Sequence, residues 1–572
     1  MELTSSSVTR TMFPVAAFTE GYQNCHPNKD DSNYTQVSWM SSSLNPKNRI
    51  DSLCPLREPK WRIDGCASMG TQFYAIPAFL NPINPIRIDV VIPGSNNIAP
   101  EFRNLLDVHT AIYLRDGRVA SLGISRYIVR VLEHWMNQFQ DFKVFYNELP
   151  FGSRIVLENI AADIKDVRLQ VIKTHFLERQ LLSSGSLQRI WGFSSPWPEL
   201  ADIAEVHLLR QLHDSVSLIQ LRNQRYILKA LTSHPKYLYH ELKVLLTLPS
   251  HPNIISRPVH LVTKQCRFGG KIAVIGFTLH YHEKGTLRDC LSLQRTQNSL
   301  HFHDQLKWAI QLTEALRCIR NEGNFYCDLR LDNVVLNDDD GVVLIDFEAR
   351  GVAFSASAPE INYLEYIHSA ATDGDNEPYP SGSRERYKQL YGRMTQGGSI
   401  PRPGDSYRNP RHGYSVPWLC LDEKEREAAE VYMLGRVLWC IFEGVGSPEK
   451  TALVRHLRED ELEFPQWNRT PENIRHLIER CTRFGKGYYN SLPVTRSGKL
   501  LVIRGAEQRH GSNVVQEVAR RWWQTEFELA EAFLEQRLRR EAAADHIPFG
   551  RPGLDDVLLE LKDMQEGDSY VF

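Results

Sequence analysis

Long apolar runs are missing from this sequence of 572 residues. No stretch of 18 consecutive apolar residues occurs, so we expect no membrane-spanning helix. The opening stretch, MELTSSSVTR, lacks the charged and then apolar layout of a secretory signal. The ten cysteines are scattered from Cys25 to Cys481 without a CxxC pair, which argues against a zinc site or a disulfide scaffold. We therefore expect a protein of the reducing cytoplasm, and the sequence leaves the nucleus open as well.

An excess of charge of one sign is also absent. The formal net charge is −2, and 42% of the residues are hydrophobic and 24% charged, which is the usual composition of a soluble globular protein. Without a net basic field, we expect neither a nucleic-acid partner nor a membrane surface to bind the chain. The length predicts about two to four domains, with room for a large core.

The N-terminal part of the chain carries few signals for chemistry. Residues 1–80 are rich in Ser, Asn and Pro and show no sustained period, so we predict that most of them are disordered or loosely attached. Residues 81–195 predict a small α/β accessory region, which could equally be an extension of the next domain. Its expected elements are strands within 86–93, 142–150 and 154–160, a hairpin turning at Asp116-Gly117, and a helix over 125–139 capped by Ser125.

From about residue 196 the pattern changes to strands followed by helices. VSLIQLRNQRYILKAL, residues 216–231, predicts two strands that turn at Arg222-Asn223. Further on, an amphipathic pattern over 303–323 predicts a helix that ends at Gly323. The other expected elements are a helix over 235–248, a strand over 271–282 and a hairpin turning at Asp340-Gly341.

Five residues in this part of the chain carry chemistry in a fixed order. Lys229 lies on a predicted strand, Glu241 on a predicted helix, Asp328 and Asn333 in the loop CDLRLDN, and Asp346 at the end of the hairpin. Taken singly, each has an ordinary explanation, since a strand Lys or a helix Glu is usually solvated. Taken together, the order and the local contexts resemble those of the protein-kinase superfamily, and most closely those of divergent kinase-like proteins of filamentous fungi.

The resemblance implies a fold and a set of roles. We expect an α+β, two-lobed protein-kinase-like fold over 196–565, with a β-rich N-lobe at about 200–282 and a helical C-lobe at about 283–565. ATP and Mg²⁺ are the implied cofactors. The implied roles are Asp328 and Arg330 in catalysis, Lys229, Glu241, Leu279 and Tyr281 in nucleotide binding, and Asn333 and Asp346 as metal ligands.

Elementary chemistry agrees with these roles. Phosphoryl transfer needs positioning and charge neutralisation, and a Lys held by Glu241 can neutralise the α- and β-phosphates. Carboxylate and amide oxygens of Asp346 and Asn333 suit Mg²⁺. Asp328 can accept or orient the proton of an acceptor hydroxyl, while Arg330 replaces the Lys that serine/threonine kinases usually carry there.

The sequence also departs from the family at several positions. No glycine occurs in RQLHDSVSLIQL, residues 210–221, where the family has a Gly-rich phosphate loop. Glu348 replaces the Gly of Asp-Phe-Gly, and Cys327 replaces the Arg that reads a phosphorylated activation segment. Glu430 stands where the family has an Asp that supports the catalytic loop.

Two inserts are expected in the C-lobe. Residues 361–415 contain many basic side chains and predict either a solvated loop or a docking surface for an acidic partner. Residues 484–548 include a long helical pattern with Trp522, Phe527 and Phe533, whose aromatics we expect to pack on the lobe. The resemblance also implies a buried ion pair between Glu360 of Ala358-Pro359-Glu360 and Arg551, which precedes the last predicted helix.

Three functional hypotheses follow. The first is an ATP-dependent phosphotransferase of protein-kinase type that acts on a Ser or Thr hydroxyl of protein. The second is a kinase of a small metabolite, since the peptide-docking landmarks are distorted. The third is a pseudokinase scaffold without catalysis, which the missing glycines and Glu348 favour.

Overall fold

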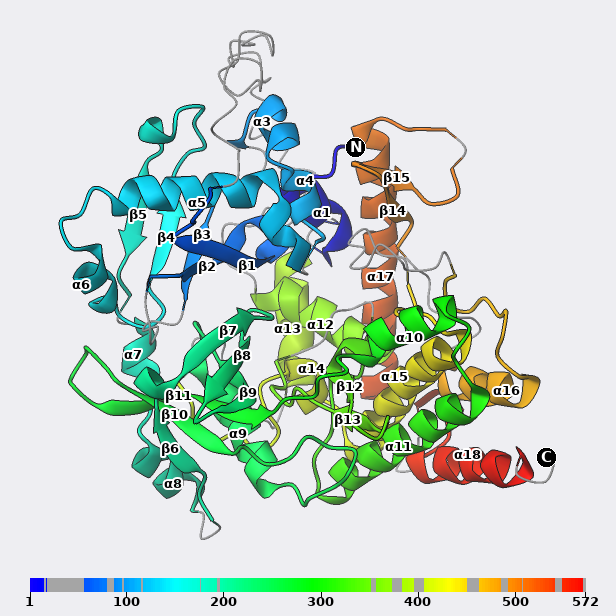
Figure 1. Ribbon diagram of the computed structural model, residues 1–572. Coiled ribbons are helices and arrows are strands. Elements are labelled where there is room, and N and C mark those ends of the chain that lie inside the picture. Colours follow the sequence, from blue (N-terminus) through cyan, green and yellow to red (C-terminus); the bar gives the residue numbers. More distant parts are fainter. Residues whose placement is uncertain are drawn as a thin grey trace.

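The computed structural model shows a mixed α+β protein (Figure 1). The residues that the structure describes are 1–14, 17, 56–79, 87–94, 97–114, 117–174, 176–192, 196–350, 356–372, 383–395, 406–449, 462–484, 492–506, 508–540 and 548–568. In this part of the chain, no helix combines the length and the apolar character that crossing a membrane requires.

A five-stranded sheet forms the first structural unit, with the strands in sequence order. The β3–β4 pair is parallel and the other neighbours are antiparallel. The strands are β1 (Trp61–Ala67), β2 (Gln72–Pro77), β3 (Ile88–Val91), β4 (Arg154–Leu157) and β5 (Leu169–Ile172). Helix α5 (Gly123–Met136) packs against the sheet through an apolar face that includes Ile128 and Leu132, both fully buried.

The prediction of disorder for 1–80 is wrong at both ends of that range. Residues at the start form α1 (Ser5–Met12), capped by the Thr4 side chain, and β1 and β2 lie near its end. Trp61 and Phe73 are fully buried in this core. Apolar side chains that are sparse along the sequence therefore still gather into one core. Most residues between these elements lie outside the described part of the chain.

Two further expectations for the accessory region are also wrong. Residues 142–150 were expected as a strand but begin with helix α6 (Phe142–Asn147), whose N-cap Asp141 accepts a hydrogen bond from the Val144 N–H. The expected hairpin around Asp116-Gly117 is flanked by helical turns, α4 (Val108–Ala111) and η7 (Gly117–Ser121), while Asp116 itself lies outside the described residues. The strands expected within 86–93 and 154–160 are confirmed.

Ser125 is not the cap of α5. The helix begins at Gly123, and the Ser125 hydroxyl donates to the Val119 carbonyl from inside the first turn. Short helices complete this region and the approach to the next sheet: η5 (Ser68–Gly70), α3 (Pro100–Leu105), η8 (Ile164–Asp166), α7 (Phe176–Gln180) and α8 (Ser184–Trp191).

A six-stranded sheet follows, in the order β6-β10-β11-β9-β8-β7. Its strands are β6 (Glu199–Asp202), β7 (His207–Gln211), β8 (Val216–Leu221), β9 (Gln224–Ala230), β10 (His260–Gln265) and β11 (Ile272–His280). Arg222 and Asn223 both have positive φ between β8 and β9, so the predicted tight turn is confirmed. Helix α9 (Pro235–Thr247) crosses from β9 and packs on β11, and η9 (Ile203–Glu205) links β6 to β7.

The remainder is mainly helical. Helix α11 (Phe302–Asn321) ends before Gly323, which has φ +69° as predicted for a helix stop. Hairpin β12 (Val334–Leu336) and β13 (Val342–Leu344) turns at Asp340-Gly341, also as predicted. The other helices around α11 are α10 (Leu287–Thr296), α15 (Glu423–Glu443), α16 (Glu472–Cys481) and α18 (Leu554–Asp568).

Both predicted inserts contain ordered helices. Insert 361–415 is no solvated loop at its start, because α12 (Pro359–Thr372) is buried along most of its length. Helix α13 (Ser383–Met394) and the short α14 (Val416–Leu419) follow it. In the second insert, α17 (Ser512–Arg540) packs on α12, and the hairpin β14 (Val494–Ser497) and β15 (Leu500–Ile503) precedes it.

The aromatic side chains of α17 pack as predicted. Phe527 lies 5.8 Å from Tyr366 and Phe533 5.8 Å from Tyr363, measured between ring centroids. The N-terminal helix α1 also lies against α17, and the Trp523 indole donates to the Thr11 carbonyl at 2.9 Å. The second insert therefore joins the beginning of the chain to its helical part, as Figure 1 shows for α1 and α17.

Candidate functional site

Lys229 lies in the middle of the six-stranded sheet and is almost fully buried. Strand β9 pairs with β8 on one side and with β11 on the other, which places Val216 and Phe277 opposite Lys229. The Lys229 Nζ lies 2.6 Å from the Glu241 Oε2, so the predicted ion pair is confirmed. Glu241 reaches inward because the buried Leu238, Leu242 and Leu245 dock the same side of α9 on the sheet.

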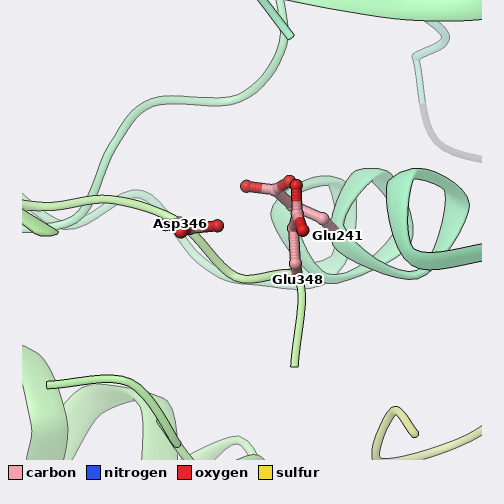
Figure 2. A group of neighbouring side chains, drawn as sticks. All are labelled: Glu241, Asp346 and Glu348. Atoms are coloured by element: carbon pink, nitrogen blue, oxygen red, sulfur yellow. The ribbon is translucent and has the colours of Figure 1, made fainter. Parts of the chain in front are cut away.

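Three carboxylates surround the Lys229 ammonium. Asp346 Oδ1 lies at 2.6 Å and Glu348 Oε1 at 3.0 Å, in addition to Glu241. Figure 2 shows the three carboxylates converging. Burial alone lowers the pKa of Lys229, but the attraction of Asp346, Glu241 and Glu348 raises it above its ordinary value. The lysine is therefore held as a cation.

The three carboxylates do not share one role. Their oxygens lie within 4.8 Å of one another, close enough to hold a metal ion, but the Lys229 ammonium already contacts all three. Burial raises the pKa of Glu241 to about 7 in spite of Lys229, and Glu348 also pairs with Arg350. Asp346 is the most exposed of the three, with 32% of its side chain accessible. It is thus the carboxylate that an incoming cation can reach.

Asp328 and Asn333 meet within one loop, as their spacing predicted. The Asn333 Nδ2 donates to the Asp328 Oδ2 at 3.0 Å and to its carbonyl at 2.9 Å. Among the described residues, the Asn333 Oδ1 accepts no hydrogen bond, which leaves an amide oxygen of the kind that Mg²⁺ accepts. Asp346 and Asn333 therefore offer donor atoms that fit the metal role expected of them.

The Asp328 carboxylate combines burial with an unused oxygen. Its Oδ2 lies 3.3 Å from the Arg330 Nη2. Its Oδ1 is buried and has no hydrogen-bond partner among the described residues. Burial raises the pKa of Asp328 to about 6, although Arg330 opposes the shift. A carboxylate with this pKa and a free oxygen can accept a proton from a hydroxyl near neutral pH.

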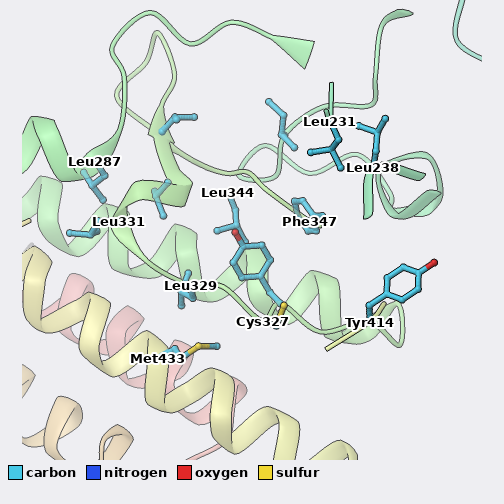
Figure 3. Packing of buried hydrophobic residues seen from close by; sticks show 14 of the residues in the cluster. Leu231, Leu238, Leu287, Cys327, Leu329, Leu331, Leu344, Phe347, Tyr414 and Met433 are labelled. Atoms are coloured by element: carbon cyan, nitrogen blue, oxygen red, sulfur yellow. The ribbon is translucent and has the colours of Figure 1, made fainter. Parts of the chain in front are cut away.

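Glu430 supports the Asp328 loop through a hydrogen bond to the backbone, as expected. Its Oε1 accepts a hydrogen bond of 2.6 Å from the Tyr326 backbone N–H, and the Tyr326 hydroxyl donates to the Ile345 carbonyl next to Asp346. Figure 3 shows the apolar packing around this loop, with Cys327, Leu329 and Leu331 among the labelled side chains. The extra methylene of Glu430 is accommodated.

Leu279 and Tyr281 stand at the end of the strand that pairs with β9. Leu279 is buried opposite Ile227, and Tyr281 is half-buried directly after β11. The structure places both near the connection from the sheet to α10, and Leu279 lies two residues along β11 from Phe277, the register partner of Lys229.

The turn between β7 and β8 is held by internal hydrogen bonds and carries the acidic residue Asp214. The N–H groups of Leu212 and His213 both donate to the Val216 carbonyl, at 2.9 and 3.0 Å. Asp214 pairs with Arg87 of the accessory region at 3.0 Å. The backbone amides of Leu212 and His213 therefore already form hydrogen bonds within the turn, as expected for a turn that lacks glycine.

Sequence reasoning missed Arg87 and assigned Glu348 no partner. Arg87 is 126 positions from the turn whose His213 carbonyl it also contacts, so no local pattern signals it. A small open pocket adjoins the site and is lined by His240, Tyr326, Asp346, Phe347 and His412, among others. No family model matches this chain, and no curated protein does either.

Glu430 makes stability depend on pH. Burial raises its pKa to about 8, so the folded state holds a proton that the unfolded state releases above about pH 4.5. The stabilisation is complete below that pH and is lost as the pH rises through 8. We expect Glu430→Gln, which keeps an oxygen for the Tyr326 N–H, to reduce the fall in unfolding free energy between pH 5 and 8 by about 2–4 kcal/mol.

Urea denaturation at several pH values measures this effect. Glu322→Gln is the matched control, since its side chain is exposed at the end of α11, and its profile should follow that of the parent protein. Identical pH profiles for Glu430→Gln and the parent protein would show that Glu430 is not protonated in the fold.

Proposed function

We propose that the protein is an ATP- and Mg²⁺-dependent phosphotransferase of protein-kinase type, with a Ser or Thr hydroxyl of a protein as the acceptor. The observation that carries the proposal is the convergence of residues chosen from the sequence. Lys229 lies 2.6 Å from both Glu241 and Asp346, and Asn333 lies 3.0 Å from Asp328. These side chains come from β9, from α9, from the loop that holds Asp328 and Asn333, and from the segment that follows β13.

The architecture supports the proposal. Helix α9 packs on the six-stranded sheet, and a mainly helical part follows from α10 to α18, as a two-lobed kinase-like fold requires. The Glu360–Arg551 ion pair, with an Oε1–Nη1 distance of 2.5 Å, also fits the relation between the Ala358-Pro359-Glu360 segment and the last helix.

Each residue then has a physical task. Lys229, fixed by Glu241, would neutralise phosphate charge, and Asp346 with Asn333 would hold Mg²⁺. An ion held by these two residues would supply positive charge that offsets the charge of the ATP phosphates. The Asp328 Oδ1 would accept the hydrogen bond, and then the proton, of the acceptor hydroxyl. Arg330, next to Asp328, would offset the charge of the transferred group.

A scaffold without catalysis is the second candidate, and the β7–β8 turn favours it. Asp214 places a carboxylate where phosphate-binding amides are expected, and the Leu212 and His213 amides are already bonded. Glu348 adds a third carboxylate at Lys229. These features weaken nucleotide binding, because ATP must displace or neutralise carboxylates before it can contact Lys229.

Calorimetric titration with ATP separates the two candidates. The phosphotransferase should bind ATP with Mg²⁺ at least about tenfold more tightly than with EDTA. Lys229→Met should lose this binding, while Lys284→Met, which removes an exposed lysine paired with Asp340, should retain it. Absence of Mg²⁺-dependent binding in the parent protein would favour the scaffold.

Activity should not require phosphorylation of the segment between Asp346 and Glu360. Cys327 has no guanidinium with which to bind a phosphate, and Ser357 is buried. Ser355 lies outside the described residues. Protein made in bacteria and treated with phosphatase should transfer phosphate at the rate of untreated protein. A loss of more than about tenfold after phosphatase treatment would contradict this expectation.

A further inference from the structure

Residues 406–414, here called the strap, lie in the first insert and reach the helices beside the six-stranded sheet. The Tyr407 hydroxyl accepts a hydrogen bond of 2.6 Å from the Trp191 indole of α8. The Asn409 side-chain amide donates to the Ile190 carbonyl at 3.1 Å. These contacts join residues more than 200 positions apart, so the strap is anchored to α8 by specific bonds.

The strap also packs along α9, next to Glu241. The ring of Tyr407 lies 5.6 Å from that of Tyr239, and the ring of Tyr414 lies 5.2 Å from that of Tyr237. The Lys236 ammonium stands 4.7 Å above the Tyr414 ring. Aromatic pairs and cation–π contacts of this kind stabilise an arrangement that depends on ring geometry. The side chains of Tyr407 and Tyr414 are both buried.

At its C-terminal end the strap reaches the segment that carries Asp346. The Tyr414 N–H donates to the Ala349 carbonyl at 3.4 Å, and the His412 ring lies 5.8 Å from that of Phe325, shortly before Asp328. Gly413 has φ +85°, and a Cβ there would lie 2.6 Å from the Ala349 Cβ. The same Cβ would lie 3.0 Å from His240 Nε2, so Gly413 fits a gap between α9 and the Asp346 segment.

These contacts exist only when α9 stands where it does. A rotation or outward shift of α9 would separate Tyr237 and Tyr239 from the strap and would also draw Glu241 away from Lys229, because a helix moves as a rigid element. The strap therefore opposes the motion that would break the Lys229–Glu241 pair.

We propose that Tyr407 and Tyr414 are positioning residues, which hold α9 in the place where Glu241 pairs with Lys229. The catalytic consequence rests on the proposed phosphotransferase function, whereas the effect on α9 does not. The strap then supplies permanently the restraint that a phosphorylated segment would supply on demand. An ordinary packing role would instead stabilise the whole fold without a particular effect on α9.

Hydrogen exchange of the full-length protein, read by mass spectrometry, tests the proposal. Gly413→Ala places a methyl group between α9 and Ala349, and Tyr407→Phe removes only the hydroxyl that joins the strap to α8. Gly392→Ala is the matched control in the same insert, because its Cβ would meet no atom within 4 Å. Exchange in α11 reports global stability in every variant.

The proposal predicts that α9 amides exchange at least about tenfold faster in Gly413→Ala, and detectably faster in Tyr407→Phe, while α11 is unchanged. In Gly413→Ala, the turnover number for phosphate transfer should fall by about tenfold, with a smaller change in the KM for ATP. Unchanged α9 exchange in both folded variants, or equal acceleration in α9 and α11, would overturn the proposal. Faster α9 exchange in a protein that never transfers phosphate would refute the proposed function but leave the strap's role standing.

Discussion

Substitution of Asp346 should strongly weaken Mg²⁺-dependent ATP binding, whereas substitution of Asp328 should leave binding intact and strongly lower the rate of phosphate transfer. Asp346 is the accessible carboxylate at Lys229, so Asp346→Asn, which keeps the shape and removes the charge, should weaken MgATP binding by about 10–100-fold. Asp328 instead presents a buried oxygen without a hydrogen-bond partner in the described part of the chain. Asp328→Asn should lower the transfer rate by about 10²–10⁴-fold, the range of a lost proton acceptor.

The pH profile gives a second signature of Asp328. Since burial raises its pKa to about 6, a base at this position is protonated below that pH and active above it. The transfer rate of the parent protein should therefore rise with pH through about 6 and then level off.

Calorimetry and single-turnover transfer measure Asp346→Asn and Asp328→Asn side by side. Equal loss of binding in both would contradict the separation of roles.

Removal of Arg551 should lower the free energy of unfolding more than removal of one partner of an exposed ion pair. Its guanidinium contacts both Glu360 oxygens, at 2.5 and 3.1 Å, across 191 positions. It also donates to the Ala428 and Arg483 carbonyls. Tyr432 and Phe549 lie within 4.8 Å of the guanidinium carbon, measured to their ring centroids. Because Glu360 would remain buried without a partner, Arg551→Ala should lower the unfolding free energy by about 3–5 kcal/mol.

Chemical denaturation of matched variants checks this effect. Arg475→Ala removes the exposed i,i+4 pair with Glu479 and should cost about 0–1 kcal/mol. The double variant Glu360→Leu/Arg551→Met, which removes both charges, should recover part of the loss. A cost below about 1 kcal/mol for Arg551→Ala would mean that the buried pair does not stabilise the fold.

Local signals predicted much of the fold between residues 200 and 350. The Arg222-Asn223 turn, the stop at Gly323 and the Asp340-Gly341 hairpin all rest on residues that tolerate positive φ or close a tight turn. Five residues of the candidate site followed from their order along these elements. The prediction that these five residues lie close together also required the long-range packing of β9, α9 and the β12–β13 hairpin. That packing was inferred from the resemblance to the protein-kinase superfamily.

The accessory region was harder to predict, because short apolar stretches do not distinguish strand from helix. Residues 142–147 read as a strand, yet Asp141 caps a helix there, and that cap was the available signal. The pairing of Arg87 with Asp214 and the packing of the strap on α9 depend on tertiary contacts between distant segments. No period or spacing in the sequence announces them.

Transfer of labelled phosphate from γ-labelled ATP to Ser/Thr-containing protein tests the central claim most directly. The parent protein with Mg²⁺ should label the acceptor, and Asp328→Asn, folded and still binding MgATP, should lower the labelling by at least about 100-fold. The same weak labelling by the parent protein and by Asp328→Asn, with acceptor proteins and small-molecule hydroxyl acceptors alike, would contradict the account.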